Sequence, residues 1–258
     1  MVTHERLSPH QTHGEFPDTA RQLPWEEISG LDTMYGLRRI AAAVFLQLAI
    51  SCHSIPMSSH RFPVSGNKAL AALDLIEVGE VDRSIHVELI YKTSANFTRE
   101  PLYPQSMPAL LRPETAQRLA RANEEVARQG FRIKIWDAYR PPEVQFALWD
   151  ACGHDDRYVA NPYHKPSQHS CGTAVDVTLV RSDGSAVKMP TAFDDFTPAA
   201  ASGAIPADPE ARAHLAVLQN AMKNAGFMML AAEWWHFIDG HYRNYPNVIE
   251  WKEMRDAF

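Results

Sequence analysis

The chain has 258 residues, of which 45% are hydrophobic, and a formal net charge of −6. This length is enough for one substantial core. The acidic balance and the absence of a Lys/Arg cluster exclude nucleic acid as the expected partner and favour small-molecule chemistry. The three cysteines, at positions 52, 152 and 171, are too few for a disulfide scaffold. Cys152 and Cys171 could pair in an oxidising compartment, but sequence does not establish the geometry that a disulfide needs.

The first 33 residues are polar, rich in His, Pro and Glu, and without a sustained hydrophobic period. Such a stretch has little apolar surface to bury, so residues 1–33 are predicted to be a poorly ordered extension. Our alternative hypothesis is that translation begins at Met34, in which case this extension is untranslated. That start would place the next segment at the amino terminus.

Residues 34–52 have the ingredients of a secretory signal peptide. A basic start precedes residues 40–50, of which only Gln47 is polar, and Cys52 follows. The apolar run is shorter than the roughly 20 residues that a transmembrane helix needs. Its end resembles a loose lipoprotein processing site, which predicts a protein of the periplasm or cell envelope with membrane attachment through a lipidated Cys52. A buried or membrane-surface helix in a cytoplasmic protein is the alternative.

Residues 53–67 form a linker rich in Ser and Pro, and the catalytic domain is expected to span residues 68–258. Alternating side chains from Ile85 onward predict a strand that delivers Tyr91 at its end. Apolar residues at helical spacing over 116–127, followed by Gly130, predict a helix that serves as scaffold.

A second alternating run, residues 131–135, predicts a strand that leads into Asp137 and Arg140. Loops that follow strands often carry the residues of a site. Arg140 has two interpretations: an ion pair with Asp137, or a fixed guanidinium aimed at the oxygen that becomes negative in a transition state. Both interpretations hold if the ion pair with Asp137 fixes the guanidinium of Arg140 in place.

Residues 173–179 suit another strand, and Asp176 lies inside this apolar run. Burying a carboxylate there would be costly unless it were paired or bound to a metal. Gly172 can adopt a backbone conformation closed to other residues, which would fold His169 back beside Asp176. A simple hydrogen-bonded His–Asp pair is the alternative to a metal site.

The later run Glu233-Trp234-Trp235-His236-Phe237 completes the inventory of a catalytic zinc site. It follows a helix that Asp208 caps and Gly226 ends, and a predicted strand over residues 227–231. His169, Asp176 and His236 are the predicted ligands, with a fourth position open for water, and Glu233 is the predicted general base. A turn or bulge must lie between Glu233 and His236, because residues three apart face opposite sides of an ideal strand.

The pattern Ser-x-His-x-x-Gly-x-Ala-x-Asp over residues 167–176, followed by Glu-Trp-Trp-His over 233–236, resembles the D-alanyl-D-alanine dipeptidases. These zinc peptidases are known from vancomycin resistance and share a fold with D,D-carboxypeptidases and the hedgehog signalling domain. The resemblance includes residues 91–97, 136–141 and 193–194. It implies an α+β fold, a single domain with a mainly antiparallel sheet flanked by helices. It also implies hydrolysis of D-alanyl-D-alanine to two D-alanines by metal-activated water, with one Zn²⁺ per chain.

The same resemblance implies the residues that bind the dipeptide. Tyr91 and Asp194 would bind its free ammonium, and Ser167 its far end. Pro190 stands where the family has Gly, which changes the allowed backbone, so Asp195 could take the role of Asp194. Another departure is Cys171, at a position where relatives commonly carry Arg.

Two other functions are compatible with these motifs. One is a D,D-carboxypeptidase or endopeptidase that acts on peptidoglycan peptides, and the other is an inactive zinc-binding module. Glu233 and Arg140 argue against the inactive module, because a structural site needs neither. The sequence predicts no oligomeric state.

Overall fold

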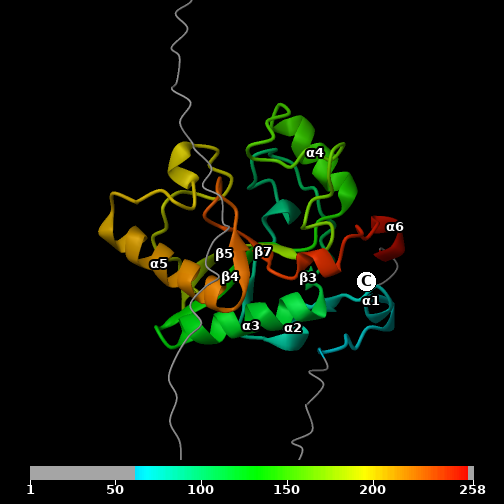
Figure 1. The fold of residues 1–258 in the computed structure, drawn as a ribbon, viewed down its shortest axis with the longest axis horizontal. Coiled ribbons are helices and arrows are strands. Elements are labelled where there is room, and N and C mark those ends of the chain that lie inside the picture. Colours follow the sequence, from blue (N-terminus) through cyan, green and yellow to red (C-terminus); the bar gives the residue numbers. More distant parts are fainter. Residues whose placement is uncertain (1–61, 255–258) are drawn as a thin grey trace, which may run out of the picture. The chain divides into compact units, whose positions relative to one another are not determined.

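A computed structural model describes residues 62–254 (Figure 1). The predicted extension, the signal-like segment with Cys52 and most of the linker lie outside the described residues. Within residues 62–254, no helix is long and apolar enough to cross a membrane. The elements in chain order are α1 Lys68–Ala72, β1 Ile76–Glu77, α2 Val78–Val81, β2 His86–Val87, the 3₁₀ turn η1 Ile90–Lys92, β3 Leu110–Leu111, α3 Pro113–Ala127, β4 Phe131–Asp137, α4 Pro142–Ala151, β5 Ala174–Arg181, η2 Pro198–Ala200, α5 Pro209–Asn224, β6 Phe227–Met229, β7 His236–Asp239, η3 Tyr242–Asn244 and α6 Trp251–Met254.

The central sheet has five strands in the order β2-β4-β5-β7-β6. Only β2 and β4 run parallel, and the other neighbouring pairs are antiparallel. A separate antiparallel pair joins β1 to β3. The α+β architecture with a mainly antiparallel sheet and flanking helices is confirmed.

The helices α3 and α5 cover one side of the sheet, and α4 lies beyond the other side (Figure 1). Asp208 Oδ1 accepts hydrogen bonds from the Glu210 and Ala211 amides at 2.9 and 3.0 Å, which begins α5. Gly130 and Gly226 take positive φ angles of 85° and 97° just after α3 and α5. Both predicted helices are therefore confirmed with their stop signals.

Two local predictions differ from the structure. The strand expected to reach Tyr91 covers only His86–Val87, and Tyr91 lies in the 3₁₀ turn that follows. Val87 is half exposed, so the alternating pattern there does not mark a strand buried along its length. The strand expected over residues 227–231 ends at Met229, and α4 was not predicted. Cys152 and Cys171 are free thiols, so the disulfide between them is not formed.

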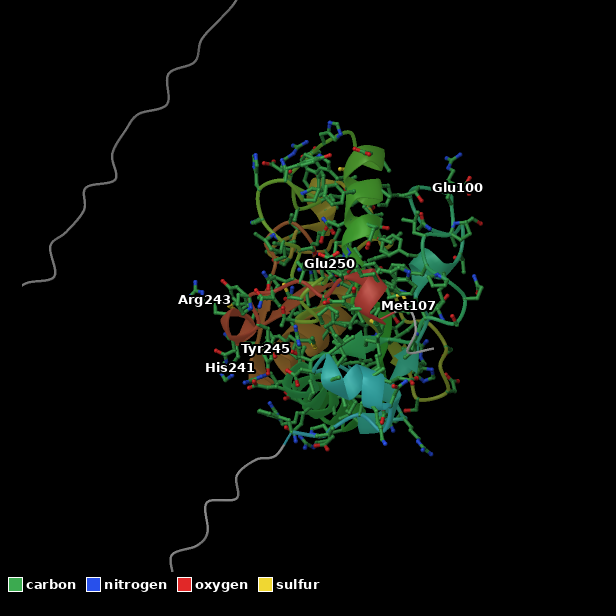
Figure 2. The ribbon with its side chains drawn as sticks, turned by 90° about the vertical axis from the view of Figure 1, so that its right-hand side faces the viewer. Glu100, Met107, His241, Arg243, Tyr245 and Glu250 are labelled. Atoms are coloured by element: carbon green, nitrogen blue, oxygen red, sulfur yellow. The ribbon has the colours of Figure 1, made fainter. Side chains whose placement is uncertain are left out.

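The segment after β7 packs back onto α3 and onto the loop that carries His169. Figure 2 shows His241 and Tyr245 together at one side of the molecule, and both approach Glu114, with His241 Nδ1 2.7 Å from Glu114 Oε1. Further along, the Ile249 amide donates to the Ser170 carbonyl at 2.9 Å. These contacts fix the backbone behind His169.

Candidate active site

The register of the sheet brings two of the predicted metal ligands together. Asp176 of β5 lies directly opposite His236 of β7 in the antiparallel ladder. On its other side Asp176 faces Asp137 of β4, after a register shift that follows Ile135. A bulge of this kind re-aims side chains, and here it turns Asp137 toward the same end of the sheet. The site is therefore built on backbone hydrogen bonds.

His169 reaches this point from a tight turn. Gly172 has φ +72°, and its amide donates to the His169 carbonyl at 2.9 Å, which folds the chain back as the sequence predicted. His169 Nδ1 lies 2.7 Å from the Ala138 carbonyl oxygen. A carbonyl only accepts, so Nδ1 carries the proton and Nε2 presents a lone pair.

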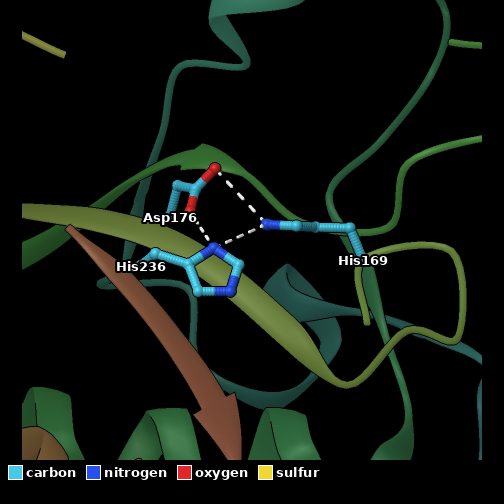
Figure 3. A group of neighbouring side chains, drawn as sticks. All are labelled: His169, Asp176 and His236. Carbon is cyan, nitrogen blue, oxygen red and sulfur yellow. Dashed lines mark hydrogen bonds and ion pairs between the residues drawn. The ribbon is translucent and has the colours of Figure 1, made fainter. Parts of the chain in front are cut away.

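Three donor atoms then converge, as Figure 3 shows. His236 Nδ1 lies 2.9 Å from Asp176 Oδ1, and His169 Nε2 lies 3.1 Å from His236 Nδ1 and 3.4 Å from Asp176 Oδ2. Ligands about 2.1 Å from a tetrahedral zinc stand roughly 3.4 Å apart. The three side chains therefore fit a metal ion, and they meet the geometric condition for a metal cluster among the described residues.

The protonation states also suit a metal. Burial favours the neutral form of Asp176, but the neighbouring His169 and His236 outweigh it and hold the pKa of this carboxyl well below its usual range. Burial lowers the pKa of His236, against the attraction of Asp176. An ionised carboxylate and neutral imidazoles are the forms in which these side chains bind metals.

Glu233 lies in the turn that precedes β7, so the predicted break between Glu233 and His236 is confirmed. Its side chain is buried. Burial raises the pKa of Glu233 well above its usual range, and the charges of Asp176 and Asp194 add to this, with Arg140 opposing. The site therefore holds several acidic side chains close together, and a divalent cation would balance their negative charge.

Arg140 is held rigidly beside these acids. Its Nε and Nη2 lie 2.8 and 2.7 Å from Asp137 Oδ2, and its Nη1 donates to Gln145 Oε1 at 2.8 Å. Tyr103 Oη donates to Asp137 Oδ1 at 2.6 Å. Burial would lower the pKa of Arg140, but Asp137 and its neighbours raise it, so the guanidinium stays charged. The predicted ion pair is confirmed.

Tyr103 and Gln145 are the supporting residues that the sequence did not reveal. Tyr103 lies in the loop between η1 and β3, which has no hydrophobic periodicity, and Gln145 lies in the unpredicted helix α4. Neither belongs to a motif, so only the fold shows that one holds Asp137 and the other holds Arg140.

Asp194 lies on the loop between β5 and α5, with a left-handed φ of 55°. Tyr91 Oη is 3.2 Å from both of its carboxylate oxygens. Burial, together with the charge of Asp176, raises the pKa of Asp194 to about 8 against the pull of Arg140. Asp195 does not line the cavity, so the exchange of roles that Pro190 suggested does not occur in this structure.

The metal donors, Glu233, Arg140 and Asp194 line one cavity of about 320 Å³, here called the catalytic cavity. The eight residues that the sequence singled out all lie on its wall: Tyr91, Arg140, Ser167, His169, Asp176, Asp194, Glu233 and His236. Residues separated by up to 145 positions thus meet at one place, and the structure leaves none of the eight elsewhere.

A His–Asp–His donor set, a buried carboxyl group and a fixed guanidinium in one cavity define a metallopeptidase. Comparison with known proteins gives the particular family. Residues 71–250 match the model of the D-ala-D-ala dipeptidase family, and the chain belongs to that family. The predicted family is therefore confirmed.

Curated relatives agree with this assignment. The D-alanyl-D-alanine dipeptidase of Escherichia coli K12 is 31% identical over 177 residues, which cover 69% of this chain and 90% of the relative. The D-alanyl-D-alanine dipeptidase of Enterococcus faecium is 29% identical over 181 residues, which cover 62% of this chain and 88% of the relative. The match extends over nearly the full length of both relatives.

Proposed function

We propose that this chain hydrolyses free D-alanyl-D-alanine to two D-alanines with one zinc ion held by His169, Asp176 and His236. The observation that carries the proposal is the position of Asp194 and Tyr91 in the cavity that also holds the metal donors and Glu233. A free amino terminus held at Asp194 would place a peptide bond of the substrate near the metal donors. A dipeptide supplies both this amino terminus and this peptide bond.

Zinc at the three donors would supply a Lewis acid that polarises the scissile carbonyl and lowers the pKa of a water molecule. Glu233 accepts the proton of the attacking water and delivers it to the nitrogen of the leaving amine. Arg140 stabilises the negative charge that develops on the carbonyl oxygen, and its bonds to Asp137 and Gln145 fix the guanidinium before the reaction begins.

Asp194 and Tyr91 select the amino end of the substrate. A free ammonium would pair with the Asp194 carboxylate, whereas an acylated nitrogen would leave this carboxylate desolvated without a partner. Ser167, which is buried on the cavity wall, would bind the far end of the dipeptide. The requirement for a free ammonium separates a dipeptidase from a carboxypeptidase that trims peptidoglycan peptides.

The test is amino-acid release by the purified, zinc-loaded protein from D-alanyl-D-alanine and, in parallel, from N-acetyl-D-alanyl-D-alanine. Cleavage of the free dipeptide alone is the expected result. Cleavage of the acetylated peptide at a similar or higher rate would move the chain to the carboxypeptidase class and remove the role of Asp194. Cleavage of neither peptide would favour an inactive zinc-binding module.

We also propose that the protein acts in the periplasm or cell envelope, attached to the membrane through a lipidated Cys52. The support is the basic and apolar pattern of residues 34–52. The intact mass of the protein isolated from its native cells tests this. A mature species that begins with acylated Cys52 is expected, and a species that retains Met1 would contradict export.

A further inference from the structure

The catalytic cavity shares part of its wall with a second cavity. The second cavity has a volume of about 280 Å³ and is here called the outer cavity. Four residues line both cavities: Gln145, Lys165, Pro166 and Ser167. Asp194 lines the catalytic cavity and not the outer one. Lys165 therefore lies with Ser167 on the side of the catalytic cavity that faces the outer cavity, and Asp194 belongs to another part of the wall.

Lys165 and Arg140 are the two residues with a permanent positive charge among the described residues that line the catalytic cavity. The guanidinium of Arg140 is buried and already bonded to Asp137 and Gln145. The side chain of Lys165 is exposed, and its ammonium has no hydrogen-bond or ion-pair partner among residues 62–254. Lys165 is therefore the cation on this wall that can pair with a ligand without losing a bond within the described part of the chain.

The charges along the wall match the two ends of a free dipeptide. Asp176, Asp194 and Glu233 are the acidic residues among the described residues of the wall, and Asp194 would hold the substrate ammonium. The carboxylate of a dipeptide belongs to the residue after the scissile bond, and the two Cα atoms are about 3.8 Å apart. The carboxylate therefore enters the same cavity, where the acids repel it unless a cation is near. The Ser167 hydroxyl can donate a hydrogen bond to it but carries no charge.

We propose that Lys165 is a specificity-determining residue, whose ammonium pairs with the C-terminal carboxylate of the dipeptide beside the Ser167 hydroxyl. The inference rests on the proposed function and narrows its substrate class to dipeptides with a free carboxylate. Lys165 does not touch the reacting atoms, so it binds the substrate and the transition state about equally. An interaction of this kind lowers KM and leaves kcat unchanged.

The experiment compares D-alanyl-D-alanine with D-alanyl-D-alaninamide, whose carboxyl end is neutral, as substrates of the zinc-loaded protein. Lys165→Met keeps the length of the side chain and removes its charge. Because an ion pair at an exposed side chain is screened by water, this variant should raise KM for D-alanyl-D-alanine by about fivefold. KM for the amide should not change. Lys165→Arg, which restores the charge, should restore the KM of the wild type.

Two further measurements separate a local ion pair from a general effect of charge. Lys223→Met is the matched control, because Lys223 is exposed at the end of α5 and lines neither cavity. It removes the same charge from the protein and should leave KM for both substrates unchanged. The difference in KM between the wild type and Lys165→Met should shrink at about 1 M salt, where the Debye length is about 3 Å.

Three results would overturn the inference and leave the proposed function intact. The first is a KM for D-alanyl-D-alanine that Lys165→Met does not change. The second is an equal rise in KM for the free acid and the amide, and the third is a rise that Lys165→Arg does not reverse, since either would show a structural effect rather than pairing with the carboxylate. A wild-type protein that does not hydrolyse D-alanyl-D-alanine would refute the proposed function and the inference with it.

Discussion

The two walls of the catalytic cavity are built in different ways. Asp176 and His236 lie on paired strands, where the ladder fixes them directly opposite each other. Asp194 lies on a long loop with a left-handed backbone, and among the described residues only Tyr91 donates a side-chain hydrogen bond to its carboxylate. The difference indicates that the sheet fixes the chemistry while the loop sets which substrate is accepted. Changes on the sheet side should therefore affect turnover, and changes on the loop should affect selectivity.

The largest effect is expected on the sheet side, from Glu233→Gln. General acid–base catalysis typically contributes about 10²–10⁴-fold, so kcat should fall by that factor. Zinc content should not change, because Glu233 is not a metal donor. Steady-state kinetics and metal analysis of the same sample measure both quantities.

Glu100→Gln is the matched control, since Glu100 is exposed and lies away from the catalytic cavity. Wild-type turnover by Glu233→Gln would show that another group transfers the proton.

The loop side is tested by Asp194→Asn. Loss of a buried charge pair with the substrate ammonium should lower kcat/KM for the free dipeptide by about 30-fold or more, which corresponds to 2 kcal/mol or more. Activity on the acetylated peptide should not fall, so selectivity between the two peptides should narrow. Asp195→Asn, the neighbouring change outside the cavity wall, should leave selectivity intact. If both variants behaved alike, the assignment of Asp194 would be wrong.

A smaller effect is expected from Tyr103→Phe, which removes the hydrogen bond to Asp137 without removing the ring. A hydrogen bond to a charged group contributes about 1.5–3 kcal/mol, so the free energy of unfolding should fall by roughly that amount. Because Asp137 positions Arg140, kcat should also fall while KM changes little. Urea unfolding and kinetics measure the two effects, and an unchanged kcat would show that Arg140 is held without Tyr103.

The last prediction concerns the pH dependence of stability. In the metal-free protein the pKa of Asp194 is raised to about 8, above its value of 3.8 in the unfolded chain. The folded state then binds more protons than the unfolded state between these pKa values. The stability that this proton contributes is present at low pH and is lost as pH rises toward 8, by up to ~1.4 kcal/mol per pH unit.

Asp194→Asn should reduce this loss of stability. The measurement is the urea unfolding free energy of the variant and of the chelator-treated wild type, each at pH 5 and at pH 8. The charge of Asp194 also helps to raise the pKa of Glu233, so the variant should lose that contribution as well, and both changes reduce the pH dependence. Parallel pH profiles would contradict the raised pKa.

Much of the metal-donor wall could be predicted from sequence because it is encoded locally. The apolar run around Asp176 marks a buried strand, Gly172 marks the turn, and the resemblance to a known family supplies the partner run with His236. The long helices α3 and α5 were predictable for the same reason, since each has a regular apolar stripe between recognisable start and stop residues.

The supporting residues could not be predicted, because they act through contacts between distant parts of the chain. Tyr103 meets Asp137, which lies 34 positions away, and no local pattern marks Tyr103 as its partner. The strand expected to carry Tyr91 was too long, since only two of its residues pair with β4 before the chain turns. Tyr91 nevertheless reaches the cavity, because the 3₁₀ turn places its ring there.

The central claim is that the donor set at the end of β5 and β7 binds one catalytic zinc ion. The most direct measurement removes metal with a chelator and then titrates zinc into the wild type and into His236→Ala, following bound zinc and hydrolysis of D-alanyl-D-alanine together. The account predicts that wild-type activity disappears with the metal, returns fully at one zinc per chain, and does not return in the variant. Full activity in the metal-free protein, or equal zinc binding and recovery in His236→Ala, would contradict it.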